Sequence, residues 1–174
     1  VAPRRPAIVG AGMSADHGRA EVYAAEAAAF DGTDLESVRS FDALAAAVET
    51  VVADEWWPGS PVQLELARKD ASSSSARQLG HGSTVIRLAA GQMTVATAAH
   101  ELAHALAGPD AGHSPTFLAA YLDVVAVITN LESSDRRGQL HVRQLRESFA
   151  AAGLLVGERT WPAPPDWTGS AIAL

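Results

Sequence analysis

The stretch Ala98–Phe117, AAHELAHALAGPDAGHSPTF, constrains this chain more than any other, because it carries three of the six histidines. Within it, His100, Glu101 and His104 fit the pattern H-E-x-x-H. The surrounding alanines and leucines predict a helix, in which four residues advance the chain by roughly 400° and about 6 Å. The two imidazoles therefore lie on nearly one face, and a nitrogen of each can reach the same metal ion.

A catalytic zinc ion takes three protein ligands and keeps one position open for water. His113, in the loop after the helix, is the candidate third ligand, and Asp110 in the same loop is the alternative. Glu101 directly follows the first histidine, so it borders the ion and is the candidate general base toward a metal-activated water. The competing interpretation is that these histidines are polar side chains of an alanine-rich helix and bind nothing.

Composition and charge limit the kinds of cross-link, metal ligand and partner that this chain can have. The chain contains no cysteine, which excludes disulfides and thiolate metal ligands. The formal net charge of −7 argues against a nucleic-acid partner, although a small basic patch could form from Arg136, Arg137, Arg143 and Arg146. No apolar run has the length of a transmembrane helix and no signal peptide is evident, so we expect a cytoplasmic protein without a membrane partner. Nothing in the sequence specifies an oligomeric state.

Apolar periodicity predicts helices over residues 17–30, 41–57, 94–107, 115–130 and 139–153. Ser40 and Thr94 are expected N-caps of the second and third helices. Alternating apolar residues predict two strands, which most simply form an antiparallel pair, over residues 61–69 and 83–90. The Ser-rich stretch 70–82 between them is polar and predicts a surface loop.

We expect three segments along the chain of 174 residues. These are a flexible N-terminal arm (1–16), a single domain (17–153) and a Pro-rich C-terminal tail (154–174) that is extended or packed as an irregular strap. A chain of this length can bury a core without disulfides. Trp56 and Trp57, at the end of the second helix, are expected to close that core.

The stretch Ala98–Phe117 resembles the zinc motif of SprT-like and WLM-type metalloproteases. In these proteins a helix with H-E-L-x-H precedes a third histidine in the context G-H-G-P-x-F. The corresponding residues here are Gly112–Phe117, with Ser114 where glycine is common. The longer order of elements also resembles an actinobacterial family of metallohydrolases. The resemblance is specific over residues 84–125 and loose over residues 17–150.

This resemblance implies an α+β, zincin-like fold, the minimal metalloprotease architecture, with helices on a small antiparallel sheet and the motif on the central helix. By the same resemblance Glu101 would be the general base, and the zinc ligands would be His100, His104 and His113. The metzincin spacing is not met, because the third histidine falls nine residues after the second. The gluzincin scheme is not favoured either, because the next helix offers Asp123 and no glutamate before Glu132.

We therefore expect a zinc-dependent hydrolase, foremost a metallopeptidase acting on a peptide or protein. In zincins the strand before the motif helix is often a sheet edge that pairs with an extended peptide; if Thr84–Ala89 is that edge, we expect a peptide substrate. If the Ser-rich stretch or the tail covers it, we expect a latent site or a smaller substrate. Candidate donors to the oxyanion are Tyr121, His81 and His141. The alternatives are a catalytically silent metal-binding or interaction module and a nucleic-acid-associated protease.

Overall fold

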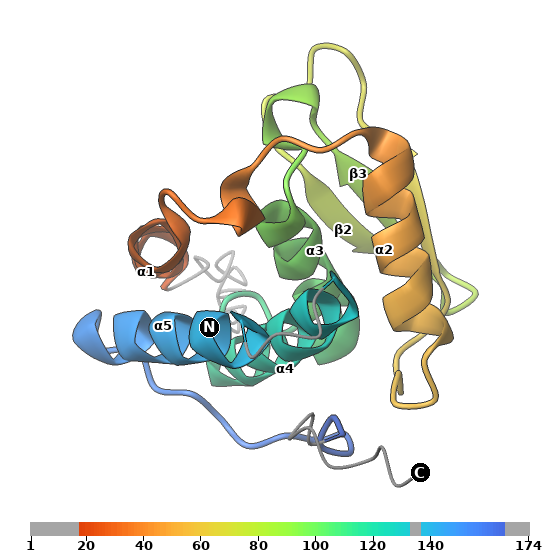
Figure 1. The fold of residues 1–174 in the computed structure, drawn as a ribbon. Helices are drawn as coiled ribbons and strands as arrows, with labels where there is room; N and C mark the ends of the chain where they lie inside the picture. The colour runs from red at the N-terminus through yellow and green to blue at the C-terminus, as the bar shows by residue number, and fades with distance from the viewer. Residues whose placement is uncertain (1–17, 133–136, 166–174) are drawn as a thin grey trace, which may run out of the picture.

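A computed structural model of the chain describes residues 18–132 and 137–165 (Figure 1). The strands are β1 (Val62–Leu66), β2 (Ser75–Gln78) and β3 (Thr84–Leu88), and short 3-10 turns lie at Asp34–Glu36 (η1) and Ala90–Gln92 (η2). The helices are α1 (Arg19–Phe30), α2 (Phe41–Ala53), α3 (Val95–Ala107), α4 (Pro115–Glu132) and α5 (Arg137–Ala151). The class is α+β, as predicted. The predicted N-terminal arm lies outside the described residues.

The three strands form a mixed sheet in the order β1-β3-β2. Strand β1 pairs with β3 in parallel, with Leu64 opposite Ile86, whereas β2 pairs with β3 antiparallel, with Ala76 opposite Ile86. The prediction of an antiparallel sheet was therefore wrong, and so was the prediction of a loop throughout 70–82. Strand β2 escaped prediction because an exposed edge strand needs no apolar alternation, and its sequence is Ser-Ala-Arg-Gln.

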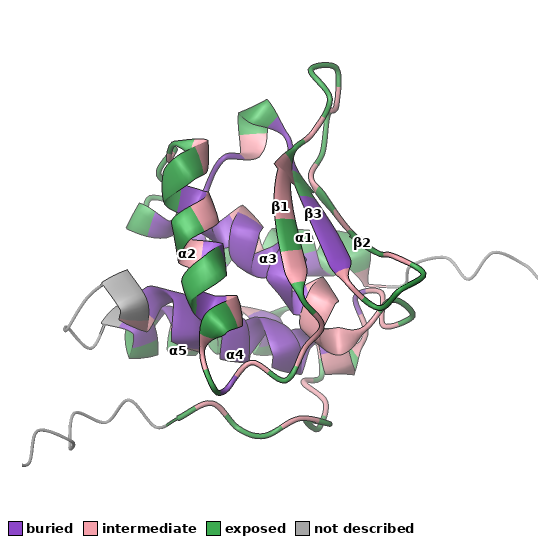
Figure 2. Cartoon of the chain, turned by 90° about the vertical axis from the view of Figure 1, so that its right-hand side faces the viewer, coloured by how far each residue is buried: buried purple, intermediate pink, exposed green. Residues whose placement is uncertain are grey.

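Helix α3 is the central element of the fold. It packs on β2 and β3 on one side and on α4 on another, while α1 lies against α5 (Figure 1). Ile86 and Leu88 of β3 join the core, whereas Arg87 between them is exposed and pairs with Glu65 of β1 at 3.1 Å. Buried residues gather in α3, α4 and β3 (Figure 2). The alanines of α3 allow these neighbours to approach closely.

Local sequence sets the ends of α3. The Thr94 hydroxyl accepts the N–H of Thr97 at 3.1 Å and begins the helix, as predicted. Gly108, with φ of 96°, ends it in a conformation that residues with side chains rarely adopt. Pro115 then begins α4, where the N–H that proline lacks would have no helical partner. The short loop between these two signals returns His113 toward α3.

Helix α2 begins as predicted and ends earlier than predicted. The Ser40 hydroxyl accepts the N–H of Ala43 at 3.2 Å. The helix stops at Ala53, because Asp54 turns the chain and accepts the N–H of Trp56 at 2.7 Å through its side chain. Among residues 18–132 and 137–165, no helix has the length and apolar character needed to cross a membrane.

The described part of the Pro-rich tail, residues 154–165, is a strap anchored to α4 and to the end of α2. Buried Asp123 of α4 accepts hydrogen bonds from Arg159 Nη2 at 2.8 Å and from Trp161 Nε1 at 3.0 Å. Trp56 donates its indole N–H to the carbonyl of Pro162 at 2.9 Å. Trp56 is buried, so it closes the core as predicted, and it does so together with the strap.

Candidate metal centre

His100, His104 and His113 converge at the end of α3 that faces the loop to α4. One ring nitrogen of each lies within 4.8 Å of those of the other two, so the three can hold a metal ion. Their ring centroids form a nearly equilateral triangle with sides of 5.1, 4.9 and 5.2 Å. Phe117 of α4 lies against all three rings, at centroid distances of 5.0, 4.4 and 4.9 Å. We call these three histidines the triad.

The donor set and its spacing fit zinc. The Nε2 atoms of His100 and His113 are 3.2 Å apart, close to the roughly 3.4 Å expected for two nitrogens bound about 2.1 Å from one tetrahedral ion. His100 and His113 are buried and His104 is half-buried, so the triad has a side toward the core and a side toward solvent. Imidazole also suits copper, nickel and iron. The geometry therefore establishes a triad able to bind metal and leaves the identity of the metal open.

Glu101 lies beside the triad with only 6% of its surface exposed. Burial raises the pKa of its carboxyl from 4.5 to about 7, against the opposing influence of His100. The backbone N–H of Ala76 in β2 also donates a hydrogen bond to this carboxyl. A carboxyl with a pKa near 7 gains and loses a proton readily at neutral pH, which is the property that a general base requires.

Helix α1 supplies a second wall of the centre, which the sequence analysis missed. Arg19, Tyr23 and Glu26 recur at spacings of four and three residues and so share one helical face. Tyr23 stacks on His100, with centroids 5.3 Å apart and planes 10° apart, and Arg19 lies 5.4 Å from the Tyr23 ring. Glu26 accepts the Nδ1 hydrogen of His100 at 2.9 Å. A polar stripe that borders the buried residues of α1 was the signal available in the sequence.

Strand β2 forms a third wall. The N–H of Leu79 pairs with the carbonyl of Ser83 at 2.7 Å, and hydrogen-bonded pairs alternate along an antiparallel ladder. The backbone groups of Ala76 and Gln78 therefore point away from β3. Thr84–Ala89 is not an open edge, because β1 and β2 flank β3 on both sides. The cover is β2, which belongs to the Ser-rich stretch, so the second of the two predicted alternatives holds for β3 and the edge beside the cleft is that of β2. The stretch predicted as a loop supplies the sheet edge beside the triad.

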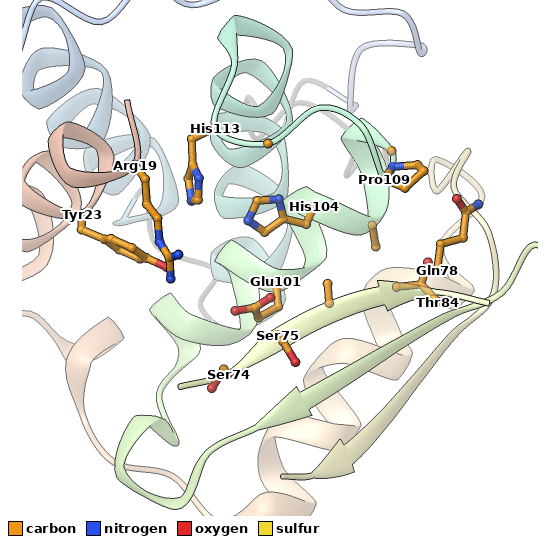
Figure 3. Close-up of a pocket in the computed structure, with 14 residues that line it drawn as sticks. Arg19, Tyr23, Ser74, Ser75, Gln78, Thr84, Glu101, His104, Pro109 and His113 are labelled. Atoms are coloured by element: carbon orange, nitrogen blue, oxygen red, sulfur yellow. The ribbon is translucent and has the colours of Figure 1, made fainter. Parts of the chain in front are cut away.

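These walls enclose an open cleft of about 290 Å³ beside the triad (Figure 3). Its lining comes from α1, β2, α3 and the loop that leads to α4, and includes Arg19, Tyr23, Ser74, Gln78, Glu101, His104 and His113. Figure 3 shows the side chains of Arg19, Glu101 and His113 approaching one another from three different elements. The cleft therefore brings together on one surface a carboxyl with a pKa near 7, a cation and two of the three histidines that can hold a metal ion.

Comparisons with protein-family models, with curated proteins and with solved structures found no match to this chain. The interpretation of the centre therefore depends on the geometry of its own residues.

The other residues that the sequence singled out and that the structure describes do not line the cleft. Asp110 is exposed and does not join the triad. Tyr121 is fully buried, His141 pairs with an aspartate of η1 at 3.2 Å, and His81 hydrogen-bonds Ser83 in the turn between β2 and β3. In the described part of the chain, none of these three oxyanion candidates lines the cleft.

The remaining residues that the sequence analysis named as candidate ligands or as a basic patch are not part of the cleft as described. Asp123 is held by the C-terminal strap. Arg143 and Arg146 are exposed on α5 and do not line the cleft. Arg136 and the side chains of Arg137 and Glu132 lie outside the described residues. The part of the predicted basic patch that is described thus lies on a different element from the triad.

Proposed function

We propose that this chain is a zinc-dependent hydrolase and that its substrate is a peptide. The observation that carries the proposal is the buried carboxyl of Glu101 beside three converging imidazoles in an open cleft. A structural zinc site is closed by a fourth protein ligand, whereas a catalytic site has three ligands and an open position. The described residues bring three histidines together, the number of protein ligands in a catalytic site, and two of the three line the cleft.

The roles of the residues follow from their positions. When bound, zinc supplies Lewis acidity that polarises water and carbonyl groups. Glu101 accepts a proton from the attacking water and returns it to the leaving amine, because it is the carboxyl that borders the triad. The Ala76 N–H holds the Glu101 carboxyl in place against β2. His100, His104 and His113 bind the metal as neutral imidazoles.

Arg19 is the residue that we assign to the developing oxyanion. Attack on a carbonyl places negative charge on its oxygen, and a fixed positive group stabilises that charge. Arg19 is the one lysine or arginine among the described residues that line the cleft. Its guanidinium points into the cleft, and the Tyr23 ring supports it through a cation–π contact (Figure 3).

A peptide is the substrate that suits the edge of β2. An exposed edge strand binds an extended chain through backbone hydrogen bonds, as in strand addition. Gln78 directs its N–H and carbonyl away from β3, and Ala76 directs its carbonyl there while its N–H is taken by Glu101; both residues line the cleft. A peptide paired with this edge would pass directly beside Glu101 and the triad.

Metal analysis and a cleavage assay test the proposal together. Protein purified without chelators is analysed for zinc beside His113→Ala, and an unfolded protein substrate is then incubated with wild type and with Glu101→Gln. We expect near-stoichiometric zinc in the wild type, little in His113→Ala, and cleavage that Glu101→Gln loses while it retains zinc. A wild type without metal contradicts the whole proposal. Bound zinc with no cleavage difference between wild type and Glu101→Gln indicates a metal-binding module instead.

A further inference from the structure

Glu26 contacts one member of the triad, His100, at the ring nitrogen that points away from the other two histidines. Its Oε2 is 2.9 Å from His100 Nδ1, whereas Nε2 of the same ring is 3.2 Å from His113 Nε2. We propose that Glu26 is the positioning residue of this centre and holds His100 with Nε2 directed at the metal. This inference rests on the metal site of the proposed function.

The hydrogen bond to Glu26 selects one form of His100. A carboxylate can only accept, so Nδ1 carries the hydrogen and Nε2 keeps its lone pair for a metal. A carboxylate behind a ligating histidine also increases the basicity of the ring. Because the two ring nitrogens point away from each other, Glu26 does not reach an ion bound at Nε2. It is therefore distinct from a fourth ligand.

A second contact fixes Glu26 itself. The hydroxyl of Tyr121, on α4, donates to the carbonyl of Ala96 at 3.4 Å and has the Glu26 carboxylate as a second hydrogen-bond partner. The chain Tyr121–Glu26–His100 thus joins α4, α1 and α3 through polar side chains.

The surroundings of the Glu26–His100 pair favour a specific role. The side chains are only 12% and 4% exposed, and a carboxylate removed from water is costly unless its hydrogen bonds are satisfied. The His100 ring is also held between Tyr23, stacked at 5.3 Å, and Phe117, tilted at 5.0 Å. The aromatic rings restrict its plane, and Glu26 sets its rotation within that plane.

The test compares zinc affinity with the stability of the metal-free protein. Full-length wild type, Glu26→Ala, Glu26→Gln and Tyr121→Phe are titrated with zinc against a chromogenic chelator, and each is unfolded by urea in EDTA. Glu21→Gln, an exposed glutamate on the same helix, is the matched control. We expect Glu26→Ala to bind zinc about 10- to 100-fold more weakly. Glu26→Gln loses less, because its amide oxygen still accepts a hydrogen bond, and Glu21→Gln is unchanged.

Tyr121→Phe gives an independent measurement, because it leaves Glu26 in place and removes its anchor. We expect a smaller loss of zinc affinity than in Glu26→Ala, and no further loss when the two changes are combined. Equal zinc affinity in wild type and Glu26→Ala overturns the inference. The inference is also overturned if the factor by which zinc affinity falls equals the factor by which the unfolding equilibrium constant of the metal-free protein changes. A wild type that binds no zinc contradicts the proposed function itself and is thereby distinguished from failure of this inference alone.

Discussion

The metal centre has two parts that arise in different ways. The motif wall comprises α3 and the loop to His113, a stretch in which fourteen residues carry the triad and Glu101. The assembled wall comprises Arg19, Tyr23 and Glu26 of α1 together with β2, segments that are distant from α3 in the sequence. In the proposed function, the motif wall supplies metal binding and proton transfer. In the assembled wall, Glu26 orients the metal ligand His100, Arg19 adds a positive charge and β2 offers a strand edge. We therefore expect changes in this wall to weaken metal binding and catalysis rather than abolish them.

Removal of a triad member is expected to have the largest effect and tests the motif wall directly. His104→Ala should lower zinc affinity by more than the roughly 10- to 100-fold that partners behind the ligands contribute. Hydrolysis should fall to the background rate. The measurement is chelator competition followed by the cleavage assay. Asp110→Ala, in the exposed part of the same loop, is the control and should bind zinc as the wild type does.

Burial of the ionised Glu101 carboxylate also lowers the free energy of unfolding, and this effect is measurable without metal. The pKa of Glu101 is about 7 when folded and about 4.5 when unfolded, so the unfolded chain releases its proton first as the pH rises. Stability is therefore lost between pH 4.5 and 7, by on the order of 3 kcal/mol, and then stays constant. Glu101→Gln should abolish this contribution and be more stable than wild type at pH 8. Urea unfolding in EDTA at pH 5 and pH 8 measures it, and an equal pH dependence in both proteins contradicts it.

Arg19 tests whether the assembled wall takes part in the chemistry. We expect Arg19→Ala to lower kcat about 100- to 1,000-fold, because one donor to the oxyanion is lost, while zinc affinity is unchanged. Arg19→Lys keeps the charge and should recover part of the rate. Steady-state kinetics on a peptide substrate separate kcat from KM. A change in KM alone would place Arg19 in substrate binding instead.

The edge of β2 is expected to give the smallest effect. Gln78→Pro removes an N–H that points away from β3, so we expect about a three- to tenfold rise in KM with little loss of stability. Gln78→Ala controls for the lost side chain. Arg77→Pro removes an N–H of a residue that pairs with β3 and should destabilise the edge itself. Equal KM values for Gln78→Pro and Gln78→Ala would argue against strand addition.

The sequence predicted the motif wall well because its information is local. Helix periodicity, the Thr94 cap and the Gly108 stop lie within the same short segment, and each is a property of a few neighbouring residues. The prediction of the sheet was poorer. The parallel pairing of β1 with β3 depends on the path of a long connection, which neither strand encodes. The polar sequence of β2 gave no periodic signal, although this strand lies beside Glu101.

By itself, the sequence determined a helix that presents His100, Glu101 and His104 on one face, and a loop able to return His113 to it. These follow from the α-helix geometry of about 3.6 residues per turn, which returns a side chain to nearly the same face after four residues, and from the backbone preferences of glycine and proline. Only the tertiary structure decided which nitrogen of His100 faces the triad and which cation lines the cleft. It also decided which strand is the edge. Each of these depends on contacts between residues far apart in the chain, and α1 and β2 acquire their roles only where packing places them against α3.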